Sequence, residues 1–105
     1  MKLREQLEYA AKAMGFTTAM LPPKGQERIT DALHWNPLTD QADSDRMACK
    51  LRMDTRISKK YALAVAVFNG FLKQCSISHN NTDEDVCRAV REARLAVAVE
   101  IGRMK

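Results

Sequence analysis

Residues 61–77 form the most constraining pattern in the sequence, because they predict a β-hairpin with a defined register. Two segments that favour β-structure, residues 62–68 and 71–77, flank the pair Asn69-Gly70. Asn-Gly favours the positive φ angles that a two-residue type I′ turn requires at both central positions. Closing the hairpin on this turn sets the cross-strand pairs, which are Phe68 with Phe71, Ala66 with Lys73, Ala64 with Cys75 and Ala62 with Ile77.

Both faces of this hairpin are largely apolar. Alanines lie on one face, whereas Leu63, Val65 and Val67 lie on the other. An antiparallel sheet with one solvated face alternates apolar and polar residues, and this hairpin does not. We therefore expect helices on both faces, in an α+β fold that forms a three-layer α/β/α sandwich.

An amphipathic helix is predicted at the start of the sequence. Apolar residues recur from Leu3 to Met14 at spacings of three and four, and Gly15 follows as a left-handed C-cap. A second helix begins after Asn36-Pro37, where Thr39 or Asp40 offers a capping oxygen. The cluster Asp40, Asp43 and Asp45 is interpreted as cap and helix-dipole chemistry rather than as a metal or acid/base site.

A long third helix is predicted to begin after Thr82, which has Asp85 three residues on, as in a capping box. Its core-facing stripe comprises Val86, Val90, Ala93, Val97 and Ile101. Weaker patterns predict a loose hairpin of residues 16–21 with 28–35 and a short strand at 53–58. With 105 residues, we expect a single domain spanning residues 1–105.

Nothing in the sequence has the spacing of a catalytic or metal site. Cys49, Cys75 and Cys87 are an odd number without a C-x-x-C pair, and His34 and His79 are isolated. We therefore expect no enzyme activity, no catalytic residue, no metal and no cofactor. No apolar run approaches the length of a membrane span, and no signal-peptide pattern occurs, so we expect a cytoplasmic protein without a membrane partner.

The candidate binding residues are the tryptophan and a local group of cations. The net charge of +4 is spread along the chain, except that Lys50, Arg52, Arg56, Lys59 and Lys60 are opposed only by Asp54. These cations form either a solvated surface or a phosphate-binding site. Arg52 and Arg56 are best suited to bind phosphate, because a guanidinium group binds it with two hydrogen bonds. Trp35 is either a core anchor or a stacking surface, and the anchor is favoured.

The block Trp35-Asn-Pro-Leu-Thr-Asp40, with Asp43 and Met47-Ala-x-x-Leu51 after it, resembles the signature of the phage ABA sandwich domain. The opening Met1-Lys-Leu-Arg-Glu-Gln-Leu and the ending Glu100-Ile-Gly-Arg103 are also similar to small proteins of that group. The resemblance implies a three-layer sandwich encoded by a tailed bacteriophage or prophage and expressed in the host bacterial cytoplasm. It implies no reaction.

Three functions follow as hypotheses. The first is a bacteriophage accessory protein that binds stoichiometrically and neutralises a host defence component, either a protein or an anionic nucleotide signal. The second is a nucleic-acid-binding accessory protein that uses the basic region 50–60, although the spread charge argues against it. The third is a small enzyme, which lacks supporting residues. A homodimer is also expected, because an open sheet edge is commonly paired across a two-fold axis.

Overall fold

The secondary structure combines three α-helices with one antiparallel sheet in the part of the chain that the computed structural model describes, which is residues 1–29, 33–58, 63–68, 71–76 and 82–105. The elements, in chain order, are α1 (Leu3–Met14), the 3₁₀ turn η1 (Thr18–Met20), α2 (Gln41–Lys50), β1 (Asp54–Ser58), β2 (Leu63–Phe68), β3 (Phe71–Ser76) and α3 (Asp83–Arg103). The expected α+β class is therefore confirmed.

The sheet has the strand order β1-β2-β3 and the register that the sequence predicts. Phe68 pairs with Phe71, and Ala66 pairs with Lys73. The turn at residues 69–70 and the expected pair of Ala62 with Ile77 lie outside the described residues. The short strand expected at 53–58 is β1, and it pairs with β2 along its whole length.

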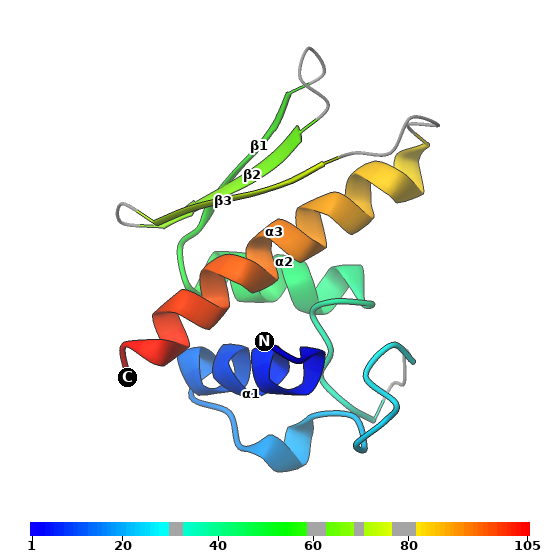
Figure 1. Cartoon of the computed structure of the whole chain (residues 1–105), viewed down its shortest axis with the longest axis vertical. Helices are drawn as coiled ribbons and strands as arrows, with labels where there is room; N and C mark the ends of the chain where they lie inside the picture. Colours follow the sequence, from blue (N-terminus) through cyan, green and yellow to red (C-terminus); the bar gives the residue numbers. More distant parts are fainter. Residues whose placement is uncertain (30–32, 59–62, 69–70, 77–81) are drawn as a thin grey trace.

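The long helix α3 lies between the sheet and α1 (Figure 1). Its predicted stripe packs on the sheet, where Ala93 and Val97 contact the fully buried Ala66. A second stripe on the opposite side of α3 packs against α1 and α2, and it comprises Leu95, Ala98 and Val99. A helix that is apolar on two sides is typical of a central layer.

The layers therefore run sheet, α3, α1 in the described residues, and the helices lie on one side of the sheet (Figure 1). A three-layer sandwich with helices on both faces is not confirmed. The second apolar stripe of α3 explains the difference, because it draws α1 onto the helix layer rather than onto the far face of the sheet.

The loose hairpin expected for residues 16–21 and 28–35 is wrong. Residues 18–20 form η1, the described part of 28–35 contains no strand, and residues 30–32 lie outside the described residues. One backbone hydrogen bond, from Trp35 N–H to the Met20 carbonyl (2.7 Å), connects the two segments. The side chains of Leu21 and Trp35 are instead each buried in the core between the helices. Their burial therefore does not depend on pairing of the two segments as β-strands.

The predicted helix ends are confirmed. Gly15 ends α1 with a φ of 77°. Asp40 caps α2 by accepting a hydrogen bond from the Asp43 backbone N–H (3.1 Å). Thr82 and Asp85 form a reciprocal capping box at the start of α3.

Candidate binding surface

The turn from α2 into β1 holds Arg52 in the left-handed backbone conformation, with a φ of 57°. The Arg52 N–H donates to the Cys49 carbonyl (3.2 Å), and the Met53 N–H donates to the Ala48 carbonyl (2.9 Å). This pair of hydrogen bonds is the Schellman motif, which satisfies the last carbonyl groups of a helix. The motif requires a positive φ at the residue that Arg52 occupies.

The end of α1 has the same motif with glycine at the equivalent position. The Gly15 N–H donates to the Lys12 carbonyl (3.1 Å), and the Phe16 N–H donates to the Ala11 carbonyl (2.8 Å). A left-handed conformation costs a non-glycine residue about 1 to 2 kcal/mol. Arg52 is the non-glycine residue with positive φ in the described part of the chain, and its side chain is exposed. Backbone strain of this kind often accompanies a functional site.

Lys50, another candidate cation, contacts the end of α1. Its Nζ donates to the Met14 carbonyl (2.6 Å) and lies 5.1 Å from the centre of the Phe16 ring. Lys105 donates in the same way to the Ala13 carbonyl (2.9 Å). Both ammonium groups thus satisfy carbonyls at the negative end of the α1 dipole, which gives Lys50 a structural role.

Arg56 lies on β1 with 78% of its side chain exposed, and it forms an ion pair with Asp54 at 3.3 Å. The structure therefore brings Arg52 and Arg56 to one segment, the turn and edge strand that follow α2. Lys59 and Lys60 lie outside the described residues. Within the described part of the basic region, Arg52 is the cation whose side chain has no hydrogen-bond or ion-pair partner.

Trp35 lies in the core with 8% of its surface exposed. Its ring meets the Phe16 ring edge-to-face, with the centres 5.2 Å apart and the planes at 84°. The burial supports the interpretation of Trp35 as a core anchor, because a buried ring offers no face for stacking with a ligand.

Sequence reasoning did not identify the buried Asn36, which organises the loop before α2. Its Nδ2 donates to the Glu27 carbonyl (2.6 Å), and its Oδ1 accepts from the backbone N–H groups of Leu38 (3.1 Å) and Thr39 (3.4 Å). The Asn36 N–H in turn donates to the Asp43 carboxylate (2.9 Å). The Trp-Asn-Pro-Leu-Thr-Asp block is therefore a loop-and-cap structure built on one buried amide.

Two arginines of α3 connect that helix to α2. Arg91 is buried, and its guanidinium donates to the Gln41 side-chain carbonyl on α2 (3.1 Å), to the Leu38 carbonyl in the loop before α2 (2.8 Å) and to the Glu84 carboxylate on α3 (2.8 Å). Arg94 donates to Asp45 at 2.6 Å. This hydrogen bond lowers the pKa of Asp45. Asp45 is thus an ion-pair partner, as part of the structural role expected for the acidic cluster.

Cys75 on β3 donates through its thiol to Glu92 on α3, with the Sγ and Oε2 atoms 2.8 Å apart. Burial raises the pKa of Cys75 to about 11, and the hydrogen bond to Glu92 and its negative charge act in the same direction. A thiol with a raised pKa is a poor nucleophile at neutral pH.

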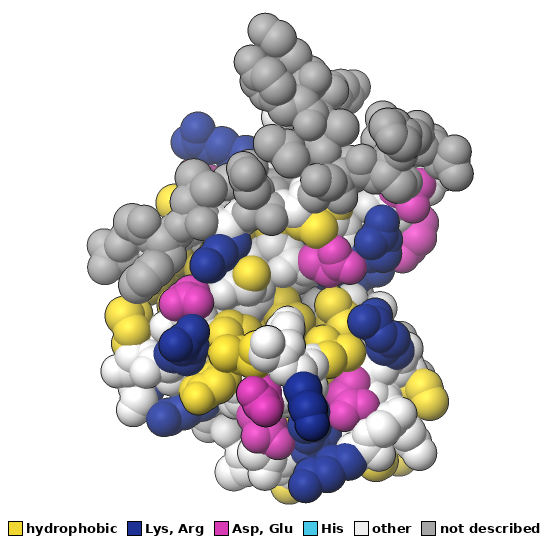
Figure 2. Space-filling model, viewed as in Figure 1, with side chains coloured by type: hydrophobic (Ala, Val, Ile, Leu, Met, Phe, Trp, Pro, Cys, Tyr) yellow, Lys and Arg dark blue, Asp and Glu magenta, His cyan; other side chains and the backbone are white. Residues whose placement is uncertain are grey.

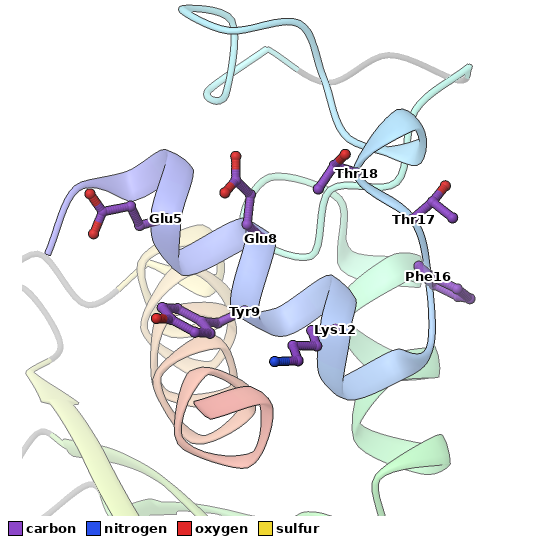
Figure 3. Close-up of a pocket in the computed structure, with 7 residues that line it drawn as sticks. All are labelled: Glu5, Glu8, Tyr9, Lys12, Phe16, Thr17 and Thr18. Carbon is purple, nitrogen blue, oxygen red and sulfur yellow. The ribbon is translucent and has the colours of Figure 1, made fainter. Parts of the chain in front are cut away.

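A surface hollow of about 510 Å³ lies between α1 and the segment that follows it (Figure 3). Its lining residues are Glu5, Glu8, Tyr9, Lys12, Phe16, Thr17 and Thr18. Figure 3 shows that the carboxylate of Glu8 and the amine of Lys12 extend in different directions from the helix. These two charged groups therefore do not converge on one point in the hollow, as the polar groups of a small-molecule site do.

The comparisons with known proteins identify no relative. No protein-family model, no curated protein and no solved structure matches this chain. In the described residues, no group of three or more His, Cys, Asp or Glu side chains is arranged to hold a metal ion. A helix with the length and apolar character needed to cross a membrane is not found in that part of the chain.

Proposed function

We propose that this chain is a tailed-bacteriophage accessory protein that acts by stoichiometric binding and neutralises a host defence component in the bacterial cytoplasm. The phage origin is inferred from the resemblance of the Trp-Asn-Pro-Leu-Thr-Asp block to the phage ABA sandwich domain. The proposed binding surface is the α2–β1 turn with the neighbouring edge strand. The partner is an acidic surface of a host protein.

The observation that carries the proposal is the combination of strain and exposure at Arg52. Glycine would form the same turn without the steric cost, as Gly15 does at the end of α1. The Arg52 side chain is exposed and forms no hydrogen bond or ion pair within the described residues, so its guanidinium is available to a partner. Guanidinium groups bind carboxylates with two parallel hydrogen bonds, which suits an acidic protein surface.

A three-layer arrangement, which the resemblance implies, is also part of this proposal. The described helices cover one face of the sheet (Figure 1).

Nucleic-acid binding is the second candidate, and the charge distribution favours it less. Lys50 is engaged by the end of α1, and Arg56 is paired with Asp54. Figure 2 shows positive and negative side chains interspersed over the visible face of the molecule. Nucleic-acid-binding domains instead gather cations on one face or along one helix.

Affinity capture from bacterial lysate tests the proposal, with released small molecules analysed beside the proteins. The wild-type chain is expected to retain one host protein at about equal molar amount. The variant Arg52→Gly, which relieves the strain and removes the cation, is expected to lose that protein. Recovery of a nucleotide without a protein would contradict the acidic-protein partner and indicate sequestration.

Lys24→Ala is the matched control, because it removes one exposed cation at a site outside the proposed surface. It changes the net charge by the same amount as Arg52→Gly, and it is expected to retain the partner. If both variants lose the partner equally, general charge rather than Arg52 explains the binding. Capture of nucleic acid that disappears steeply with added salt would favour the second candidate.

A further inference from the structure

Strand β1 is the outer strand of the sheet, and in the described residues it pairs with β2 alone. One edge of its backbone therefore has N–H and C=O groups that no described strand satisfies. Natural proteins cover such an edge or pair it, because an open edge is a template for another strand.

The exposed side chains of β1 are self-complementary. Asp54 and Arg56 are two residues apart and so lie on the same face of the strand, with 66% and 78% of their side chains exposed. Ile57 is half exposed although it is apolar. Two copies of this strand, placed side by side in opposite directions, present opposite charges to one another.

Charge selects the register of such a pairing. In an antiparallel strand pair, two residues that face each other either both direct their backbone N–H and C=O groups toward the other strand or both direct them away from it. When the two strands are copies related by a two-fold axis, the numbers of two facing residues therefore differ by an even amount. A register centred on Asp54 opposes two carboxylates, and one centred on Arg56 opposes two guanidinium groups. The register centred on Thr55 places Asp54 opposite Arg56 of the partner subunit. Like charges directly opposite are destabilising, and opposite charges stabilise.

We propose that a second copy of this chain pairs its β1 strand with β1 in this register. Thr55 then faces the partner's Thr55 at the axis, and Ile57 faces the partner's Met53. Threonine pairs and apolar pairs are both favourable across antiparallel strands. The exposed apolar surface of Ile57 gains a neighbour, and the sheets that the described strands form in the two copies become one continuous sheet.

The symmetry of the pairing also fixes where the helices lie. The two-fold axis of an antiparallel strand pair is perpendicular to the sheet, so α3 of both protomers covers the same face. The opposite faces of the two sheets become continuous. The pairing uses the same edge strand as the proposed binding surface. It is tested on the purified chain without any partner, so its failure is distinguishable from a failure of the proposed function.

Charge exchange tests the proposal by sedimentation velocity across roughly two decades of protein concentration up to about 1 mM. The wild-type chain is expected to form dimers as the concentration rises. Asp54→Arg gives two basic positions on the edge, and Arg56→Asp gives two acidic ones. Each variant alone is expected to weaken dimerisation at least about tenfold, because like charges then face one another.

An equimolar mixture of Asp54→Arg and Arg56→Asp is expected to restore dimers, because opposite charges again face one another. Both substituted residues are exposed, and circular dichroism confirms that each variant is folded. Glu5→Arg and Lys24→Asp change the net charge by the same amounts at exposed positions away from β1, and they are expected to dimerise like the wild-type chain. A monomeric wild-type chain at every concentration overturns the proposal, as does a mixture that does not associate.

Discussion

The backbone of Tyr9 lies directly against Gly102 where α1 crosses α3. A Cβ atom on Gly102 would lie 2.7 Å from the carbonyl carbon of Tyr9 and closer still to its oxygen. Neither group is the end of a flexible side chain, so neither can rotate away. The absence of a side chain at Gly102 therefore sets how closely the first and last helices approach.

Gly102→Ala is expected to destabilise the protein by about 2 to 3 kcal/mol, because the helices must separate to admit one methyl group. This loss exceeds the gain of about 1 kcal/mol that alanine normally brings to a helix. Urea denaturation measures the free energy of unfolding. An unchanged or increased stability would contradict the close approach of the two helices.

Asn36→Ala is expected to lower the free energy of unfolding by about 3 kcal/mol. The buried amide bonds the Glu27 carbonyl and the Leu38 N–H, and removing it leaves these groups without a partner. Gln26→Ala, at an exposed amide in the preceding turn, is the control and is expected to change stability by less than about 0.5 kcal/mol. Thermal denaturation of the two variants side by side distinguishes the two amides.

Asp45 is expected to make stability depend on pH below neutrality. Because Arg94 lowers the pKa of Asp45 in the folded chain, the contribution is present above the unfolded-state pKa of about 3.9. It is lost as the pH falls through the lower folded-state pKa. Since Asp45 is half exposed and screened by solvent, the effect is below about 1 kcal/mol.

Comparison of the wild-type chain with Asp45→Asn at pH 7 and at pH 2 measures this effect. The stability difference is expected to be full at pH 7 and to be smaller at pH 2, because Asp45 becomes protonated as the pH falls through its lowered pKa. In an Arg94→Met background, Asp45→Asn is expected to have little effect at either pH. A difference that persists unchanged at pH 2 would exclude the ion pair as its source.

Cys75 is expected to react with iodoacetamide at pH 8 at least about tenfold more slowly than the exposed Cys49, because burial and Glu92 raise the pKa of Cys75. Glu92→Gln is expected to speed the reaction of Cys75 by removing the neighbouring negative charge. Peptide mass spectrometry at timed intervals reports each cysteine separately. Equal rates at the two cysteines would be incompatible with the raised pKa.

Local patterns predicted the elements whose geometry depends on a few neighbouring residues. The sequence pair Asn69-Gly70 predicted the pairing of Phe68 with Phe71, and Gly15 predicted the end of α1. Such features are encoded by backbone preferences at single positions. They do not depend on which distant segment packs nearby.

The position of α3 between two layers was not predicted, although its second stripe is present in the sequence. Leu95, Ala98 and Val99 follow a helical spacing on the side of α3 opposite to the stripe that was recognised. Gly102, which lies against the Tyr9 backbone, is on the same side of α3. An apolar stripe identifies a buried face, but it does not name the element that covers it.

The candidate site divides in the same way. The sequence predicted that Arg56 belongs to a group of surface cations, and its side chain is exposed. The sequence did not predict the positive φ of Arg52, because that angle depends on the Schellman motif at the end of α2. The role of Lys50 depends on the end of α1, which is 36 residues away in the chain. Contacts over such sequence distances require the tertiary arrangement.

Arg52→Gly removes both the backbone strain at residue 52 and the cation that is proposed to bind the partner. It is expected to raise the free energy of unfolding by about 1 kcal/mol, because glycine adopts the positive φ without strain. Arg52→Lys keeps a cation and the strain, and it is expected to retain the stability of the wild-type chain. A gain in stability of Arg52→Gly shows only that the backbone at residue 52 is strained. Binding must therefore be measured on the same samples to test whether the Arg52 side chain contacts the partner.

The most direct measurement is a calorimetric titration of the captured host protein with the wild-type chain, Arg52→Gly and Lys24→Ala. The account predicts one-to-one binding by the wild-type chain and by Lys24→Ala, and at least about tenfold weaker binding by the more stable Arg52→Gly. If Arg52→Gly binds the partner as tightly as the wild-type chain, Arg52 is not part of the binding surface and the central claim is wrong.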